Sequence, residues 1–153
     1  MIDVKSIEIE KLRIKAESYF KEGYYCSEAV VKAFEDVTGV RFSDDFKKSM
    51  AILGEGIGGQ GCICGAVSAS ILILGRFTGR LNVYEDKQQS QKAGKLFIER
   101  FKEKYKTTCC KSLTKRSEMI FGIGKFKHCP QITSFCAVLL LEILSENNLL
   151  RNL

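Results

Sequence analysis

Residues 64–79 read CGAVSASILILGRFTG, and this stretch decides the fold class. Its side chains are apolar on every face of a helix until Arg76, which is typical of a helix surrounded by other helices. It follows residues 54–61, GEGIGGQG, where five glycines in eight residues exclude a stable helix. The sequence therefore predicts a glycine-rich loop that leads into a buried central helix.

Helical periodicity also governs the segments before the loop. Apolar stripes predict one helix over residues 9–20 that ends at Gly23 and a second over residues 29–37 that ends at Gly39. Ser43, followed by two aspartates, is a typical N-cap and predicts a short third helix.

Helices are expected after the central segment as well. Asn82 and Glu85 resemble a capping box for a long basic helix with an apolar stripe over residues 93–105. One short helix is expected around residues 115–121, and a last helix runs from Pro130. We predict an all-α bundle of about six helices that forms a single helical domain over residues 1–153.

The composition limits the location and the partners of the protein. The N-terminal sequence MIDVKSIEIEKLRIKAE carries charges throughout and lacks the apolar core of a signal peptide. The apolar runs AVSASILILG and FCAVLLL have about half the length that a membrane-spanning helix needs. We therefore expect a cytoplasmic protein with no membrane partner.

Charge is concentrated in one part of the chain. Residues 87–127 hold twelve lysines and arginines against three glutamates, a net charge of +9. The aromatic residues of this stretch, Phe97, Phe101 and Tyr105, follow the spacing of a helix core instead of interleaving with arginines on one surface. We interpret the charge as a solvated helix face and expect no nucleic-acid partner.

The seven cysteines are the main functional signal of the sequence. An odd number of cysteines in a reducing compartment argues against a set of structural disulfides. Three of them, Cys26, Cys64 and Cys129, fall where helices are predicted to begin, and Cys129 is expected at the N-cap before Pro130. Because the helix dipole favours negative charge there, we expect lowered thiol pKa values.

The other cysteines differ in their surroundings. Cys109 and Cys110 are adjacent, which strains a mutual disulfide, so we expect one functional partner among them, with Lys111 stabilising the thiolate of Cys110. Cys136 lies on the apolar stripe of the last helix and is expected to be inert. Cys62 is expected to be an accessory of Cys64.

This order of motifs resembles a known family. The segments YYCSEAV, CGAVSA, CKSL and HCPQI, followed by a terminal amphipathic helix, are similar to the putative redox-active protein family that is named for its C, GCAxxG, C, C cysteine pattern. The resemblance places the family's four cysteines at Cys26, Cys64, Cys110 and Cys129. It implies redox activity or metal binding and specifies no substrate. The family motif ends in glycine, whereas the segment CGAVSA of this chain ends in Ala69, which suggests slightly wider helix packing.

Three hypotheses follow for these four cysteines. The first is thiol/disulfide chemistry, which makes the protein a thiol-dependent oxidoreductase if it is an enzyme; its redox partner is left open. The second is an iron–sulfur cluster or a zinc ion held by the same Cys26, Cys64, Cys110 and Cys129. The third is a helical interaction protein with structural cysteines. A homodimer is compatible with each.

Two further motifs are weaker evidence for a function. Gly54, Gly56 and Gly59 satisfy the G-x-G-x-x-G pattern, but a helix precedes them and no βαβ unit follows, so we expect no dinucleotide site. His128 adjoins Cys129 in sequence, which is a weak basis for a Cys–His catalytic pair.

Overall fold

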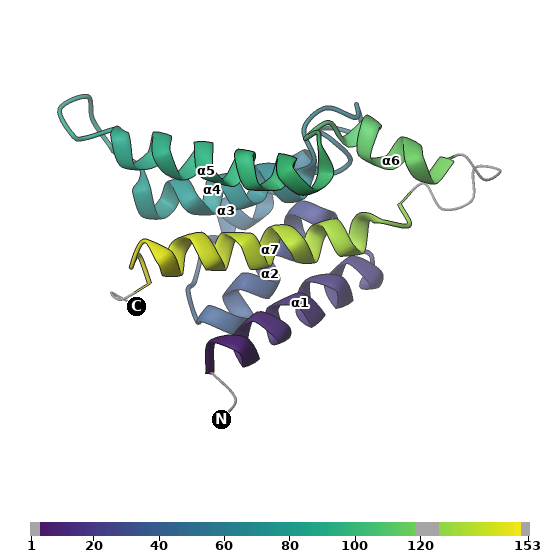
Figure 1. The fold of residues 1–153 in the computed structure, drawn as a ribbon, viewed down its shortest axis with the longest axis horizontal. Coiled ribbons are helices and arrows are strands. Elements are labelled where there is room, and N and C mark those ends of the chain that lie inside the picture. Colours follow the sequence, from purple (N-terminus) through teal and green to yellow (C-terminus); the bar gives the residue numbers. More distant parts are fainter. Residues whose placement is uncertain (1–3, 119–125, 151–153) are drawn as a thin grey trace.

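The computed structural model describes residues 4–118 and 126–150. Over these residues the chain forms seven α-helices, one short 3₁₀ helix and no strand (Figure 1). In chain order these are α1 (Val4–Glu22), α2 (Cys26–Thr38), α3 (Asp44–Ser49), the 3₁₀ helix η1 (Ala51–Leu53), α4 (Gly65–Thr78), α5 (Gln88–Tyr105), α6 (Cys110–Glu118) and α7 (Cys129–Glu146). The predicted all-α class is confirmed.

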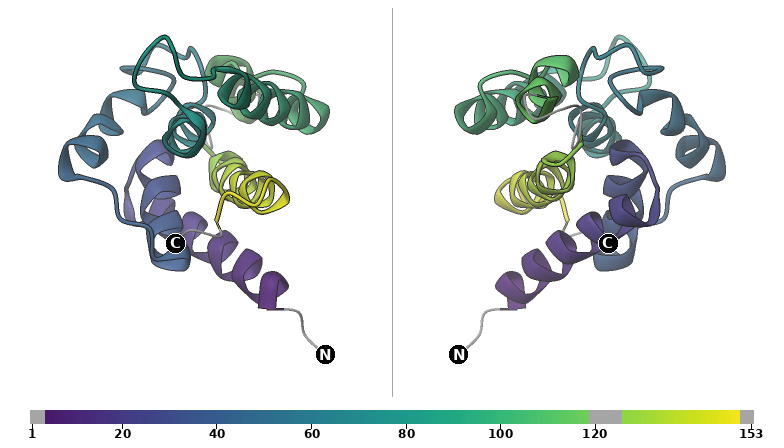
Figure 2. Two further views of the ribbon diagram at one scale, coloured as in Figure 1. Left: turned by 90° about the vertical axis from the view of Figure 1, so that its left-hand side faces the viewer. Right: turned by 90° about the vertical axis from the view of Figure 1, so that its right-hand side faces the viewer.

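Two helices form the centre of the bundle. The helix α4, predicted as the central one, packs against α2, α5 and α7, and α7 packs against α1, α2, α4 and α5. Figure 2 shows α7 enclosed between α1 on one side and α5 on the other. The largest buried side chains, among them Phe34, Phe97 and Phe101, fill the space between these helices. A helix with neighbours on most sides must be apolar over most of its surface, as both sequences are.

Local signals fix several helix ends. Gly39 ends α2 in the left-handed conformation, with φ of 76°, and its N–H donates to the carbonyl oxygen of Glu35. Ser43 caps α3 by accepting a hydrogen bond from the N–H of Phe46, at 3.2 Å. Both ends were predicted from the sequence, because these residue types satisfy the backbone groups that a helix terminus leaves unpaired.

The predicted capping box at Asn82 is wrong. Asn82 and Glu85 do hydrogen-bond to each other, at 3.1 Å, but they do so within an exposed turn, and α5 begins only at Gln88. Arg80 completes this turn by donating to the carbonyl oxygens of Val83 and Glu85. The polar side chains that suggested a cap are thus used to fold the connection between α4 and α5.

The short helix expected around residues 115–121 begins earlier than predicted. It is α6, which starts at Cys110, and the part of the prediction beyond residue 118 lies outside the described residues. Its first turn follows directly on a short antiparallel pairing of the chain around Ile63 with the chain around Cys109.

The last helix has the length and composition of a membrane span. The helix Cys129–Glu146 is long and apolar enough to cross a membrane, yet 61% of it is buried inside the protein, as is typical of the core helix of a bundle. The sequence shows shorter apolar runs because the polar residues Thr133 and Ser134 lie within this stretch. Both hydroxyls donate to carbonyl oxygens one turn earlier in the same helix.

One buried hydrogen bond ties the start of α2 to the segment before the glycine loop. The Ser27 hydroxyl is fully buried and donates to the carbonyl oxygen of Met50, at 2.7 Å. A Ser27→Ala variant will remove this hydrogen bond and leave the Met50 carbonyl oxygen with the N–H of Leu53 as its remaining donor, at 3.1 Å, which costs about 0.5–1.5 kcal/mol of unfolding free energy. Urea unfolding monitored by circular dichroism measures the loss, and a change below about 0.3 kcal/mol would contradict the assigned role.

Candidate functional site

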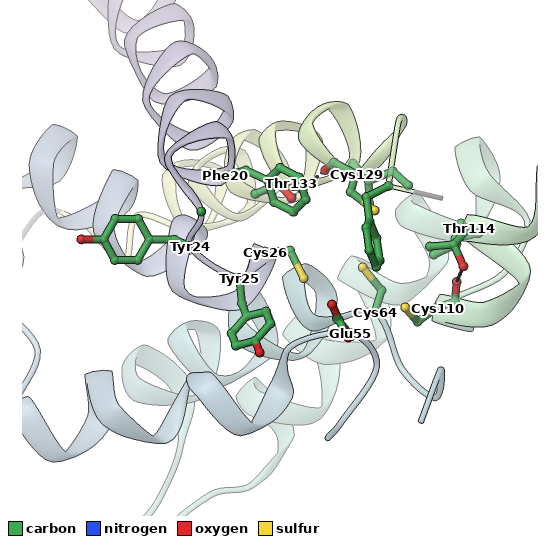
Figure 3. A pocket seen from close by; sticks show the side chains of 14 residues that line it. Phe20, Tyr24, Tyr25, Cys26, Glu55, Cys64, Cys110, Thr114, Cys129 and Thr133 are labelled. Atoms are coloured by element: carbon green, nitrogen blue, oxygen red, sulfur yellow. Dashed lines mark hydrogen bonds between the residues drawn. The ribbon is translucent and has the colours of Figure 1, made fainter. Parts of the chain in front are cut away.

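The four cysteines singled out by the sequence line one cavity of about 200 Å³. Figure 3 shows their sulfur atoms directed towards a common space from four separate elements. We call it the cysteine cavity; its sulfur-bearing lining is Cys26, Cys64, Cys110 and Cys129. The remaining three lie elsewhere: Cys62 is exposed, Cys109 is outside the lining, and Cys136 is fully buried in the core. All seven are free thiols in this structure.

Each of the four lies at the start of a helix. Cys26, Cys110 and Cys129 are the first residues of α2, α6 and α7, and Cys64 is the N-cap of α4. Cys129 therefore lies one residue inside the helix, whereas the sequence placed it at the N-cap. Cys110 is a helix-start cysteine that the sequence analysis missed, because α6 was expected to begin further along the chain.

The glycine loop brings these helix starts together by close backbone approach. A Cβ atom on Gly65 would lie 2.7 Å from the sulfur of Cys26, and one on Gly56 would lie 2.7 Å from the Cβ of Cys110. Carbon atoms in real structures do not approach this closely, so side chains at positions 56 and 65 are excluded. The start of α4 thus closely approaches Cys26 at the start of α2, and Gly56 of the glycine loop closely approaches Cys110 at the start of α6.

Two backbone segments hold the other side of the cavity. The N–H of Cys64 donates to the carbonyl oxygen of Thr108, at 2.8 Å, and the N–H of Lys111 donates to that of Gly61, at 3.0 Å. Between them the N–H of Cys110 donates to the carbonyl oxygen of Cys62. The pairing fixes the position of Cys110 relative to Cys64, although 46 residues separate them in sequence.

The sulfur of Cys26 has polar surroundings. It accepts hydrogen bonds from the backbone N–H groups of Ser27, Ala66 and Glu55, and from the thiol of Cys64. The hydrogen bond from Cys64 contributes most, and together these donors outweigh desolvation, so that the pKa of Cys26 is lowered. The arrangement stabilises a thiolate at Cys26, because every donor points at the sulfur where negative charge develops.

The expected lowering of the pKa at Cys64 and Cys129 is wrong. The hydrogen bond that Cys64 donates to Cys26 raises the pKa of Cys64 well above its ordinary value, and burial adds to this effect. Burial also raises the pKa of Cys129, to about 12. At Cys64 the hydrogen bond to Cys26 and burial together outweigh the N–H of Val67, which lowers the pKa, and at Cys129 desolvation outweighs the helix dipole.

The effect of Lys111 on Cys110 stays a prediction, but Lys111 does act on the adjacent thiol of Cys109. The pKa of Cys109 is lowered, first by the hydroxyl and the N–H of Ser112 and also by the charge of Lys111. Cys109 lies outside the cysteine cavity, with its sulfur 3.4 Å from the carbonyl oxygen of Gly61. The vicinal pair therefore divides, with Cys110 facing the cavity and Cys109 facing away from it.

Glu55 is a residue of the cavity that the sequence analysis missed. Its side chain lines the cavity beside Cys26 and Cys64 (Figure 3), and its N–H donates to the sulfur of Cys26. Its backbone has φ of 53°, a conformation that only a few per cent of non-glycine residues adopt. The sequence did offer one signal for this residue. Glu55 is the single charged residue of the glycine-rich loop, and it lies between Gly54 and Gly56.

Over the described residues, the four cysteines are not grouped as a site for a metal ion. Four thiols are suitable ligands for zinc or for an iron–sulfur cluster. Within residues 4–118 and 126–150, however, no three His, Cys, Asp or Glu side chains are grouped so that they could hold a metal ion. His128 is the N-cap residue of α7 and is not part of the lining.

Comparison with protein families identifies one match. A family model described as "Putative redox-active protein (C_GCAxxG_C_C)" matches residues 24–143, which include all four cysteines of the cavity. Comparisons with curated proteins and with solved structures give no match.

Proposed function

Because the chain belongs to the putative redox-active C_GCAxxG_C_C family, we propose that it performs thiol–disulfide exchange, with Cys26 as the attacking thiolate and Cys64 as the resolving thiol. The observation that carries the proposal is the set of donors around the Cys26 sulfur. Thiolate is the nucleophile in disulfide exchange, and an exchange reaction also needs a second thiol within reach.

The first step is attack by the Cys26 thiolate on one sulfur of a disulfide R–S–S–R. A bond forms between Cys26 and that sulfur, the original S–S bond breaks, and the leaving thiolate takes a proton from solvent to become R–SH. Cys26 is then part of a mixed disulfide and no longer carries charge.

The second step is resolution by Cys64. Once Cys26 is no longer an anion, the Cys64 thiol loses its hydrogen-bond acceptor. Cys64 gives up its proton and attacks the sulfur of Cys26, and the second R–SH leaves. The sum is reduction of one disulfide to two thiols and oxidation of Cys26 and Cys64 to one disulfide. Cys64 is assigned this role because its thiol already contacts Cys26.

Disulfide mapping tests the pairing. After oxidation with a disulfide reagent, free thiols are alkylated and the linked peptides are identified by mass spectrometry; we expect a Cys26–Cys64 link. A Cys26→Ser variant will lose the link. A Cys62→Ser variant is the matched control, because Cys62 is exposed and lies outside the lining, and it will keep the link.

Two results would contradict the proposal. If alkylation counts are the same before and after oxidation, the protein forms no disulfide and thiol exchange is excluded. If the link joins Cys26 to Cys110 or to Cys129, the assignment of Cys64 as the resolving thiol is wrong, although both alternatives line the same cavity.

A further inference from the structure

The polar side chains in the lining of the cysteine cavity, besides the four cysteines, are one carboxylate and two threonine hydroxyls. Six of the fourteen lining residues are aromatic or aliphatic: Phe20, Tyr24, Tyr25, Leu113, Phe126 and Ile132. The hydroxyl ends of Tyr24 and Tyr25 point away from the cysteines (Figure 3). Neither hydroxyl therefore points into the cavity.

The polar side chains of the lining are already engaged. The hydroxyl of Thr114 donates to the carbonyl oxygen of Cys110, at 2.9 Å, and that of Thr133 donates to the carbonyl oxygen of Cys129, at 2.7 Å. The nearby N–H groups of Ser27, Ala66 and Glu55 point at the Cys26 sulfur. A ligand with several polar groups would have to leave some of them without partners, which costs about 1–3 kcal/mol for each buried group.

The charge of the cavity is negative. It contains the carboxylate of Glu55 and the stabilised thiolate position of Cys26, and no Lys, Arg or His of residues 4–118 or 126–150 lines it. An anionic ligand would meet like charge without a compensating cation. At the separations found within one small cavity, such repulsion is worth at least about 1.4 kcal/mol, or tenfold in rate.

The volume limits the size of the ligand. The cavity measures about 200 Å³, and a buried cavity of about 150 Å³ is sufficient for a benzene molecule. One aryl group or one short alkyl chain of a disulfide therefore fits beside the Cys26 sulfur. A folded protein cannot follow its disulfide into this space.

We propose that the substrate of the cysteine cavity is a low-molecular-weight disulfide with uncharged, apolar or aromatic substituents, and that Glu55 discriminates against anionic disulfides. This inference rests on the proposed thiol exchange and names its substrate class. In the exchange the apolar substituent on the attacked sulfur occupies the cavity in the mixed disulfide with Cys26. It leaves as a neutral thiol when Cys64 resolves the bond.

Two probe disulfides of similar size test the inference. Dithiobis(nitropyridine) is uncharged and aromatic, and dithiobis(nitrobenzoate) carries a carboxylate on each ring. The rate at which each modifies Cys26 at neutral pH is measured by peptide-resolved mass spectrometry, and the ratio of the two rates is divided by the same ratio for N-acetylcysteine. We expect this normalised preference for the uncharged probe to be at least about tenfold.

A charge-neutral variant isolates the role of Glu55. The preference will fall at least threefold in a Glu55→Gln variant, because the amide keeps the shape of the side chain without its charge. A Glu99→Gln variant is the matched control; Glu99 is an exposed residue of α5, paired with Lys95 and outside the lining, and its replacement will leave the preference unchanged.

The possible failures are distinguishable. If both probes oxidise the protein to the Cys26–Cys64 disulfide with no normalised preference, the substrate class is wrong and thiol exchange stands. If the preference survives in Glu55→Gln, Glu55 is not the discriminating residue. If an oxidised protein reacts with Cys26 faster than the uncharged probe, the restriction to small disulfides is wrong. If no reagent produces a disulfide that contains Cys26, the proposed function itself is overturned.

Discussion

Replacing Gly65 by alanine will displace the sulfur of Cys26 from its donors and lower the unfolding free energy by about 1–3 kcal/mol. The added Cβ would lie 2.7 Å from that sulfur and 2.7 Å from the carbonyl oxygen of Leu53. The sulfur can rotate away at low cost, but the Leu53 carbonyl belongs to the backbone of η1 and cannot. The start of α4 must therefore shift, and the N–H of Ala66 will no longer be aimed at Cys26.

Two measurements separate the effects of this substitution. Urea unfolding reports the loss of stability, and the rate of Cys26 alkylation against pH reports the thiolate. We expect the midpoint of the alkylation profile to move to higher pH, because a donor that lowers the pKa of Cys26 is lost.

A glycine of the same helix provides the control. Gly75 is an exposed residue of α4, and a Cβ there would meet no atom within 4 Å. A Gly75→Ala variant will therefore gain stability, by about 0.5–1 kcal/mol, and keep the Cys26 profile. Equal stability losses at both positions would show that α4 simply tolerates no alanine, and an unchanged Cys26 profile in Gly65→Ala would refute the close approach.

The fold could be predicted from the sequence wherever burial sets a periodic pattern. The fully apolar stretch after Cys64 and the stripes that end at Gly23 and Gly39 correspond to α4, α1 and α2. Prediction failed where polar side chains serve a turn instead of a helix end. Asn82 and Glu85 have the spacing of a capping box, and only the conformation of the chain after Gly79 decides which structure they stabilise.

The positions of the site cysteines were more predictable than their chemistry. Cys64 precedes a glycine and an apolar run, Cys129 precedes a proline, and Cys26 precedes the apolar stripe of the second predicted helix, and these signals located all three at helix starts. It could not supply the pKa directions, because these depend on which sulfur the N–H groups face. Three of the four donors to Cys26 come from residues distant in sequence, Glu55, Cys64 and Ala66, so only the folded chain shows that Cys26 receives them.

Replacing Cys64 by alanine will slow the reaction of Cys26 at neutral pH by about tenfold or more, because the Cys64 thiol is the largest single cause of the lowered pKa of Cys26. A hydrogen bond to a charged group contributes about 1.5–3 kcal/mol, which corresponds to at least that factor in the thiolate population. The same variant removes the resolving thiol, so we expect the mixed disulfide of Cys26 with the reagent to accumulate in place of an internal disulfide.

The control for this variant is Cys136→Ala, which makes the same chemical change at a fully buried thiol of α7 outside the cavity. It will leave the rate and the products at Cys26 unchanged. Mixed disulfide that is still resolved in Cys64→Ala would show that Cys110 or Cys129 is the resolving thiol.

Below the ordinary thiol pKa, the thiolate of Cys26 should make the protein more stable as the pH rises. Since the pKa of Cys26 is lower in the folded protein than in the unfolded chain, the stabilisation from its thiolate is fully present above the ordinary thiol pKa and is lost as the pH falls through the lower, folded value. Cys64→Ala brings the folded pKa back towards the ordinary one and will shrink this pH-dependent gain, whereas Cys136→Ala will not. Unfolding free energies of the three proteins test the point without any substrate when they are measured from below the folded pKa of Cys26 up to the ordinary thiol pKa. Above that value the raised pKa values of Cys64, Cys129 and Cys136 make the stability fall with rising pH, so the comparison stays below it. A gain of equal size in wild type and Cys64→Ala would mean that the backbone N–H groups alone stabilise the thiolate, leaving Cys64 only its role as the resolving thiol.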